Sequence, residues 1–219
     1  MTVLELLDRL NERLAEDGIA PIAFDSDCRE GICGSCGITI NGVPHGPVAN
    51  VATCNQHVRS FTDGATITLE PFRAGSFPVI RDLVVDRSAL DRLLAAGGFV
   101  SVDAGTAPDA DTHSTIQTTA ERALDFAACI GCGACVAACP NGAAHLFAGA
   151  KLAHLAISGR GPSERGRRAV AIVAQLDAEF GPCSTHGECV EVCPASIPLT
   201  AIATVNRERL RASWRGRDD

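Results

Sequence analysis

Eleven cysteines are the residues of this 219-residue sequence whose type and spacing are best suited to chemistry. They form two blocks, one in the first third of the chain and one beyond its middle. An odd number of cysteines cannot form a closed set of disulfides, and residues 1–5 do not read as the start of a signal peptide. Metal binding is therefore the leading interpretation of these thiols.

The first block has the spacing C-x4-C-x2-C with one distant cysteine, and its members are Cys28, Cys33, Cys36 and Cys54. This is the plant-type ferredoxin pattern for a [2Fe–2S] cluster. We expect Gly31, Gly34 and Gly37 to let a tight loop wrap a cluster, with positive φ and no Cβ in the way, so that the loop can aim backbone N–H groups at the sulfurs.

A structural zinc site is the alternative for this block. Zinc sites favour paired C-x2-C units, and only one such unit occurs here. His45 and His57 lie nearby in the sequence, but four thiols are already available, so we expect both to be loop residues rather than ligands.

The second block contains two runs with one frame. The first is C-x2-C-x2-C-x3-C-P, formed by Cys129, Cys132, Cys135, Cys139 and Pro140. This is the bacterial ferredoxin run, whose fourth cysteine serves the other cluster of a pair. The second run repeats the frame with Cys183, Cys189, Cys193 and Pro194, and has His186 where the second cysteine would be.

Reciprocal pairing of the runs predicts two further ligand sets. The set for a [4Fe–4S] cluster is Cys129, Cys132, Cys135 and Cys193. The remaining set is Cys139, Cys183 and Cys189, with His186 beside it. Three thiolates suit a [3Fe–4S] cluster, which lacks one corner iron. The competing hypothesis is that His186 binds a fourth iron, as imidazole does in Rieske centres.

The elements around the first block predict a small α+β domain over residues 1–86. Leucines and Val3 recur at helical spacing up to Asp17 and Gly18, which end that helix. Residues 38–40 and 66–69 read as short strands between Gly and Pro turns.

The elements around the second block predict an all-α domain over residues 87–219. A helix capped by Asp86 or Ser88 should end at residues 97–98, and a loop should cover 101–117. Thr118 and Glu121 form a sequence match to a capping box, for a helix that runs into Cys129. Further helices are expected over 143–157, over 163–180 and from about Pro198 or Thr200.

Composition excludes some classes of function. The net charge of −7, the absence of Tyr and the single Trp argue against nucleic-acid binding. No apolar run approaches eighteen residues, so we expect no transmembrane helix, and any membrane association should depend on a partner.

The combined pattern resembles the iron–sulfur subunit of succinate dehydrogenases and fumarate reductases. Four segments carry the resemblance in the family's order: residues 28–36, residues 77–86, the run ending at Pro140 and the run ending at Pro194. The segment Phe-Pro-Val-Ile-Arg-Asp at 77–82 has no counterpart in ordinary ferredoxins. The resemblance implies a β-grasp domain followed by a helical ferredoxin domain, with the ligand sets given above.

The resemblance also implies a function. Electrons would come from the FAD of a succinate-oxidising flavoprotein subunit, pass through the three clusters, and reach a quinone at a membrane-anchor subunit. The chain would be peripheral, held at the cytoplasmic face of the cell membrane, and would contain no catalytic residue for carbon chemistry. Alternatives are a fumarate reductase working in the opposite direction, the iron–sulfur subunit of another flavin dehydrogenase, and a free polyferredoxin.

Three features depart from the family pattern. The chain begins at the first helix, so the N-terminal strand pair of the β-grasp sheet is missing from the sequence given. Relatives that use ubiquinone carry a tryptophan pair after the first Cys-Pro, whereas residues 141–144 here contain no aromatic, which favours menaquinone. His186 occupies a position that is usually small and apolar.

Overall fold

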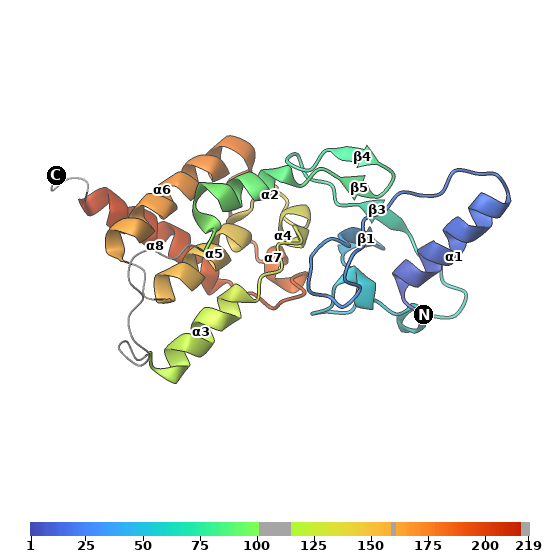
Figure 1. The fold of residues 1–219 in the computed structure, drawn as a ribbon, viewed down its shortest axis with the longest axis horizontal. Coiled ribbons are helices and arrows are strands. Elements are labelled where there is room, and N and C mark those ends of the chain that lie inside the picture. The colour runs from blue at the N-terminus through green and yellow to red at the C-terminus, as the bar shows by residue number, and fades with distance from the viewer. Residues whose placement is uncertain (101–114, 159–160, 216–219) are drawn as a thin grey trace, which may run out of the picture. The chain divides into compact units, whose positions relative to one another are not determined.

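A computed structural model describes residues 1–100, 115–158 and 161–215 (Figure 1). Its contacts divide the chain into two compact units. The first unit comprises Met1–Leu90, Ile130–Ala144 and Glu179–Ser196, and the second comprises Asp91–Cys129, His145–Ala178 and Ile197–Asp219. Both cysteine-run segments 130–144 and 179–196 thus belong to the unit that contains the plant-type block.

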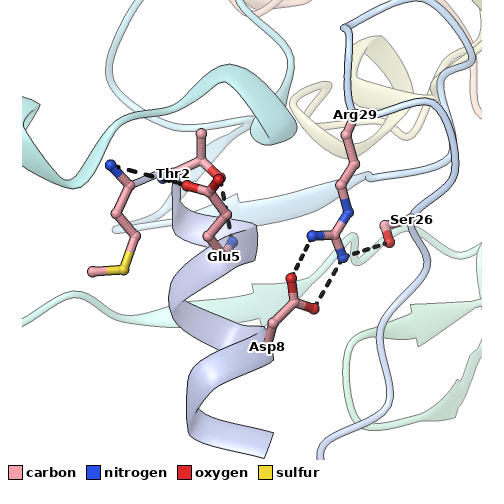
Figure 2. Close-up of polar contacts among 6 residues, drawn as sticks. Thr2, Glu5, Asp8, Ser26 and Arg29 are labelled. Atoms are coloured by element: carbon pink, nitrogen blue, oxygen red, sulfur yellow. Dashed lines mark hydrogen bonds and ion pairs between the residues drawn. The ribbon is translucent and has the colours of Figure 1, made fainter.

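The first unit begins with helix α1, Val3–Glu16, as the leucine spacing predicted. Thr2 caps it: the Thr2 hydroxyl accepts the Glu5 N–H at 3.2 Å, and the Glu5 carboxylate accepts the Thr2 N–H (Figure 2). Leu4 and Leu7 are buried on its inner face. They pack in a core with Cys36 and Cys54, so two of the predicted cluster ligands lie in the hydrophobic interior.

A three-stranded antiparallel sheet follows, in the order β2-β1-β3. Its strands are β1 (Ile38–Ile40), β2 (Val43–Pro44) and β3 (Leu69–Pro71). The prediction of β1 is confirmed, but the predicted strand 66–69 is wrong, because pairing with β1 begins only at Leu69. Asn41 is the reason: its side chain accepts the Thr68 N–H at 2.7 Å and its own N–H donates to the Thr68 carbonyl. Because the Thr68 N–H binds a side chain and not the backbone of β1, the regular pairing of β3 with β1 starts at Leu69.

Short elements that the sequence did not predict complete the first unit. They are the 3₁₀ turns η1 (Thr53–Asn55) and η2 (Val58–Ser60), the hairpin strands β4 (Val79–Arg81) and β5 (Val84–Val85), and the helices α4 (Ala134–Ala137) and α7 (Glu188–Glu191). The hairpin falls in segment 77–86, one of the four segments that carry the family resemblance. Asp82 turns it with φ 50°, and its carboxylate accepts the Ala23 N–H at 2.8 Å.

The described part of the second unit is helical. Its elements are α3 (Gln117–Ala127), α5 (His145–Ile157), α6 (Pro162–Glu179), α8 (Thr200–Arg215) and the π-helical turn η3 (Leu94–Gly98), which continues α2 (Ser88–Leu93). Helix α5 is apolar on most of its surface and contacts α3, α8 and η3, so it forms the centre of this unit. The predicted helices are confirmed with ends shifted by one or two residues.

One predicted helix start is wrong. Helix α3 begins at Gln117 after Ile116, which makes no side-chain cap, so Thr118 lies inside the helix and the capping box with Glu121 does not form. The side chain of Gln117 instead donates to Glu121 at 2.9 Å, a pairing of residues one turn apart. The helix ends at Ala127, two residues before Cys129. Most of the predicted loop 101–117 lies outside the described residues.

The structure confirms a mixed chain of helices and small sheets. The finer assignment to β-grasp and helical ferredoxin folds, and the division at residue 86, remain predictions. Within the described residues, no helix is both long enough and apolar enough to span a bilayer.

The contact between α5 and α8 supplies a test of packing. A methyl group added at Gly149 would lie 2.4 Å from the carbonyl oxygen of Ala201, whereas one at Gly166 would lie 3.3 Å from the Cβ of Ala212. Glycine to alanine in a helix normally stabilises by about 1 kcal/mol. We expect Gly149→Ala to destabilise by about 1–3 kcal/mol instead, because backbone must move, and Gly166→Ala to change stability little. Denaturant titration of both variants measures this, and a stabilised Gly149→Ala would contradict it.

Candidate iron–sulfur sites

Glycine conformation shapes the first cysteine loop. Gly31 and Gly34 have φ of 77° and 74°, as predicted for a loop that must turn tightly. At Gly37 the predicted positive φ is wrong. The predicted need for a residue without a Cβ is confirmed there, because an added Cβ would lie 2.6 Å from the ring of Phe72.

Backbone N–H groups of this loop point at cysteine sulfurs. Among these bonds are Glu30 N–H to Cys28 Sγ at 3.3 Å, Gly31 N–H to Cys54 Sγ at 3.2 Å, and Ser35 N–H to Cys33 Sγ at 3.4 Å. The second of these brings Cys54 to the loop despite its distance in sequence. Donors aimed at sulfur stabilise thiolates and the more negative state of a bound cluster, so the loop fits the [2Fe–2S] group that its spacing predicts.

The four thiols of this block have unlike environments. N–H donation, first from Glu30 and then from Ile32, lowers the pKa of Cys28 to about 7. Burial first, and then charge interactions with the neighbouring Cys54 and Cys33, raise the pKa of Cys36 to about 12. Since Cys33 and Cys54 both affect the pKa of Cys36, the three thiols lie close enough to interact.

An ion pair fixes the loop to helix α1. Arg29, which has φ 54°, donates two hydrogen bonds to the Asp8 carboxylate, one of them at 2.9 Å, and a third to Ser26 Oγ at 3.2 Å (Figure 2). Hydrogen bonding from Arg29 lowers the pKa of Asp8 below its ordinary value. Sequence patterns do not indicate this pair, because its members are 21 residues apart.

A buried histidine supports the turn that carries Cys54. Thr53 donates its N–H to His45 Nδ1 at 3.2 Å, and the Thr53 hydroxyl lies 2.9 Å from the same nitrogen. Accepting an N–H requires Nδ1 to be unprotonated. Burial, and then the positive charge of Arg87, lowers the pKa of His45 to about 4. His45 therefore lies in the interior beside the site, as a neutral side chain.

The two bacterial-type runs share one backbone frame. Gly133 and Gly187 have φ of 89° and 105°, and each is followed by a four-residue helix, α4 or α7. Cys135 and Cys189 occupy the second position of these helices. Helices α4 and α7 contact each other, so the runs meet as a pair within the first unit.

The frame also extends to the position where the runs differ. Gly131 has φ 67°, and the corresponding Thr185 keeps φ 55° although a threonine rarely adopts it. His186 follows Thr185 as Cys132 follows Gly131. Cys132 is buried, whereas the His186 side chain is exposed.

Contacts between the runs gather the ligands predicted for the third cluster. Asn141 donates its side-chain N–H groups to the Pro182 carbonyl at 3.0 Å and to Ser184 Oγ at 2.8 Å. Burial raises the pKa of Cys189 to about 11, and the charges of Cys139 and Cys183 act in the same direction. These three cysteines are therefore neighbours.

The ligands predicted for the second cluster are divided between the two units. Cys132, Cys135 and Cys193 belong to the first unit, while Cys129 is the last residue of a segment of the second. Within the residues that the structure describes, no three Cys, His, Asp or Glu side chains converge on a single metal ion. A cluster of several irons does not require such convergence, since different cysteines bind different irons.

Family models agree with these sites. Residues 1–92 match the 2Fe-2S iron-sulfur cluster binding domain, and residues 128–197 match the 4Fe-4S dicluster domain. The chain is thus an iron–sulfur electron-transfer protein with two cluster-binding domains. These matches favour clusters over the zinc alternative.

Curated relatives define the family more closely. The chain is 34% identical over 209 residues to the fumarate reductase iron-sulfur subunit of Escherichia coli O6:H1, covering 92% of this chain and 78% of the relative. It is 30% identical over 193 residues to the succinate dehydrogenase iron-sulfur subunit of Bacillus subtilis, covering 86% and 72%. The chain belongs to the family of succinate dehydrogenase and fumarate reductase iron–sulfur subunits.

A solved structure agrees at the level of the fold. A chain of the Mycobacterium smegmatis Sdh1 complex in the apo form aligns with a TM-score of 0.57 and 22% identity, covering 98% of this chain and 85% of that one.

Gly34 offers a test of the site with a matched control. An added Cβ at Gly34 would lie 2.4 Å from the Ile130 carbonyl oxygen, whereas Gly64, with the same φ of 74°, has no atom within 4 Å of that position. Both alanine variants carry the left-handed backbone penalty of about 1–2 kcal/mol. We expect only Gly34→Ala to lose bound iron per chain, because only there must two backbones separate. Equal iron content in the two variants would contradict this.

His45 predicts a pH dependence of stability. Its pKa is about 4 in the folded chain against 6.5 ordinarily, so only the unfolded state takes up the proton between these values. Stability should therefore fall as pH drops from about 6.5 toward 4, by about 2 kcal/mol between pH 7 and pH 5. Denaturant titration of wild type and His45→Gln at both pH values measures this, and the variant should lack this part of the loss. The same pH dependence in both proteins would argue against it.

Proposed function

We propose that this chain carries electrons between the FAD of a succinate-oxidising flavoprotein subunit and a quinone at a membrane-anchor subunit. The observation that carries the proposal is that Cys139, Cys183 and Cys189 are neighbours. They come from two runs that repeat one ferredoxin spacing and one backbone conformation. When bound, [2Fe–2S], [4Fe–4S] and [3Fe–4S] clusters supply one-electron redox chemistry. The chain's own residues supply thiolate ligands, N–H donors and a partly buried environment.

The first ligand set would hold the [2Fe–2S] cluster: Cys28, Cys33, Cys36 and Cys54. Donors from Glu30, Gly31 and Ser35 to three of these sulfurs would favour its reduced form. Burial of Cys36 and Cys54 would limit water around it.

The third cluster is proposed as [3Fe–4S] rather than a four-iron cluster with a histidine ligand. Gly131 and Thr185 both have left-handed backbone conformations, so His186 occupies the position in its run that Cys132 occupies in the other. Its side chain is exposed, while the three cysteines beside it are partly buried, which suits a bystander better than a ligand.

Direction and quinone type extend the proposal. Menaquinone is the favoured quinone, because residues 141–144 contain no aromatic. Succinate oxidation is the proposed direction. Reduction of fumarate by the same cluster scaffold is the alternative. Comparing both activities of the purified complex distinguishes the directions. The chain would lie at the cytoplasmic face of the membrane through its anchor partner.

Electron paramagnetic resonance tests the cluster assignment. We expect a near-isotropic signal in the oxidised complex that vanishes on reduction, and signals of reduced [2Fe–2S] and [4Fe–4S] centres. The oxidised signal should persist in His186→Ala. It should disappear in His186→Cys, because a fourth thiolate at the Cys132-equivalent position can hold a fourth iron.

Absence of the oxidised signal from the wild-type complex would contradict the [3Fe–4S] assignment. A silent oxidised wild type with two reduced [4Fe–4S] centres would make His186 a ligand. Iron-free preparations of the intact complex would overturn the electron-transfer role altogether.

A further inference from the structure

Arg87 joins the two kinds of cysteine loop within the first unit. Its guanidinium donates to the Gly34 carbonyl at 2.6 Å and to the Ser35 carbonyl at 3.2 Å, both between Cys33 and Cys36. It also donates to the carbonyl of Cys132 at 2.8 Å, in the first bacterial-type run. One side chain thus binds the loop predicted for the [2Fe–2S] cluster and the loop predicted for the [4Fe–4S] cluster.

The two loops also touch directly at this place. An added Cβ at Gly34 would lie 2.4 Å from the Ile130 carbonyl oxygen and 3.1 Å from the Cys132 nitrogen. Gly34 is buried in this contact. The backbones therefore meet with no side chain between them, and Arg87 holds the carbonyls on either side of the junction.

The chemistry of arginine suits this role. A guanidinium is planar and carries five N–H donors in a fixed fork, so it can serve several carbonyls at once, whereas the lysine ammonium is a point charge on a flexible stem. Arg87 is half-buried, and its three acceptors are neutral carbonyls that do not cancel its charge. After burial, the charge of Arg87 is the second cause of the lowered pKa of the buried His45.

We propose that Arg87 is a positioning residue that fixes the first and second cluster loops against each other and raises the reduction potential of both centres. The proposal rests on the proposed function, since it concerns electron passage between the first two clusters. Reduction adds one negative charge to a cluster, so a fixed positive charge beside both loops favours both reduced forms. Fixed loops keep the distance between the centres constant.

Redox titration of the intact complex, followed by electron paramagnetic resonance, tests both parts. Arg87→Met removes the charge and all three hydrogen bonds at similar volume. Arg87→Lys keeps the charge but cannot bind the three carbonyls in one plane. Arg9→Met on the exposed surface of α1 makes the same change in net charge away from the junction and serves as the control.

We expect the midpoint potentials of both the [2Fe–2S] and [4Fe–4S] centres to fall in Arg87→Met and to stay near wild type in Arg87→Lys and Arg9→Met. Spin relaxation of the reduced [2Fe–2S] centre, which a nearby reduced [4Fe–4S] centre accelerates, should slow severalfold in both Arg87 variants. If Arg87→Met loses its clusters, Arg87→Lys still decides, through this relaxation, whether the loops are held by the guanidinium.

Unchanged potentials in Arg87→Met, or a shift equal to that of Arg9→Met, would overturn the electrostatic part. Wild-type relaxation in Arg87→Lys would overturn the positioning part. Absence of both reduced signals from the wild-type complex would instead overturn the proposed function, so the two failures are distinguishable.

Discussion

A methyl group on Gly34 would lie 2.4 Å from the Ile130 carbonyl oxygen, so the plant-type loop and the first bacterial-type run meet backbone against backbone. Arg87 binds carbonyls on both sides of this contact, and Cys36 lies in the core with Leu4 and Leu7 of α1. Electron transfer depends on short distances, and close approach of two loops requires that no side chain separates them.

The paired runs show how a frame can persist when a ligand changes. Thr185 keeps the left-handed conformation of Gly131, and a glycine precedes the short helix in both runs. We attribute the strain of a threonine with φ 55° to the proposed role of this loop, which is to position Cys183 and Cys189 as ligands. Among the predicted ligand positions of the two runs only His186 is not a cysteine, which is the difference that the proposed [3Fe–4S] cluster would require.

Prediction from sequence succeeded where the information is local. Cysteine spacing, left-handed glycines and the leucine repeat of α1 act over a few residues, and the structure confirms α1, β1 and the loop glycines Gly31 and Gly34. It failed where a distant group competes. Strand β3 starts late because Asn41 binds Thr68, and Gly37 is needed for the ring of Phe72 rather than for its φ.

The sequence by itself determined the family and predicted the cysteine ligand sets, since both depend on residue types at short fixed spacing. Only the tertiary structure decided which other residues hold the loops. Arg87 reaches Gly34 across 53 residues, Asn141 reaches Ser184 across 43, and Arg29 reaches Asp8 across 21. No local pattern specifies such partners, because they are set by how separate segments pack after each has formed its own turns and helices.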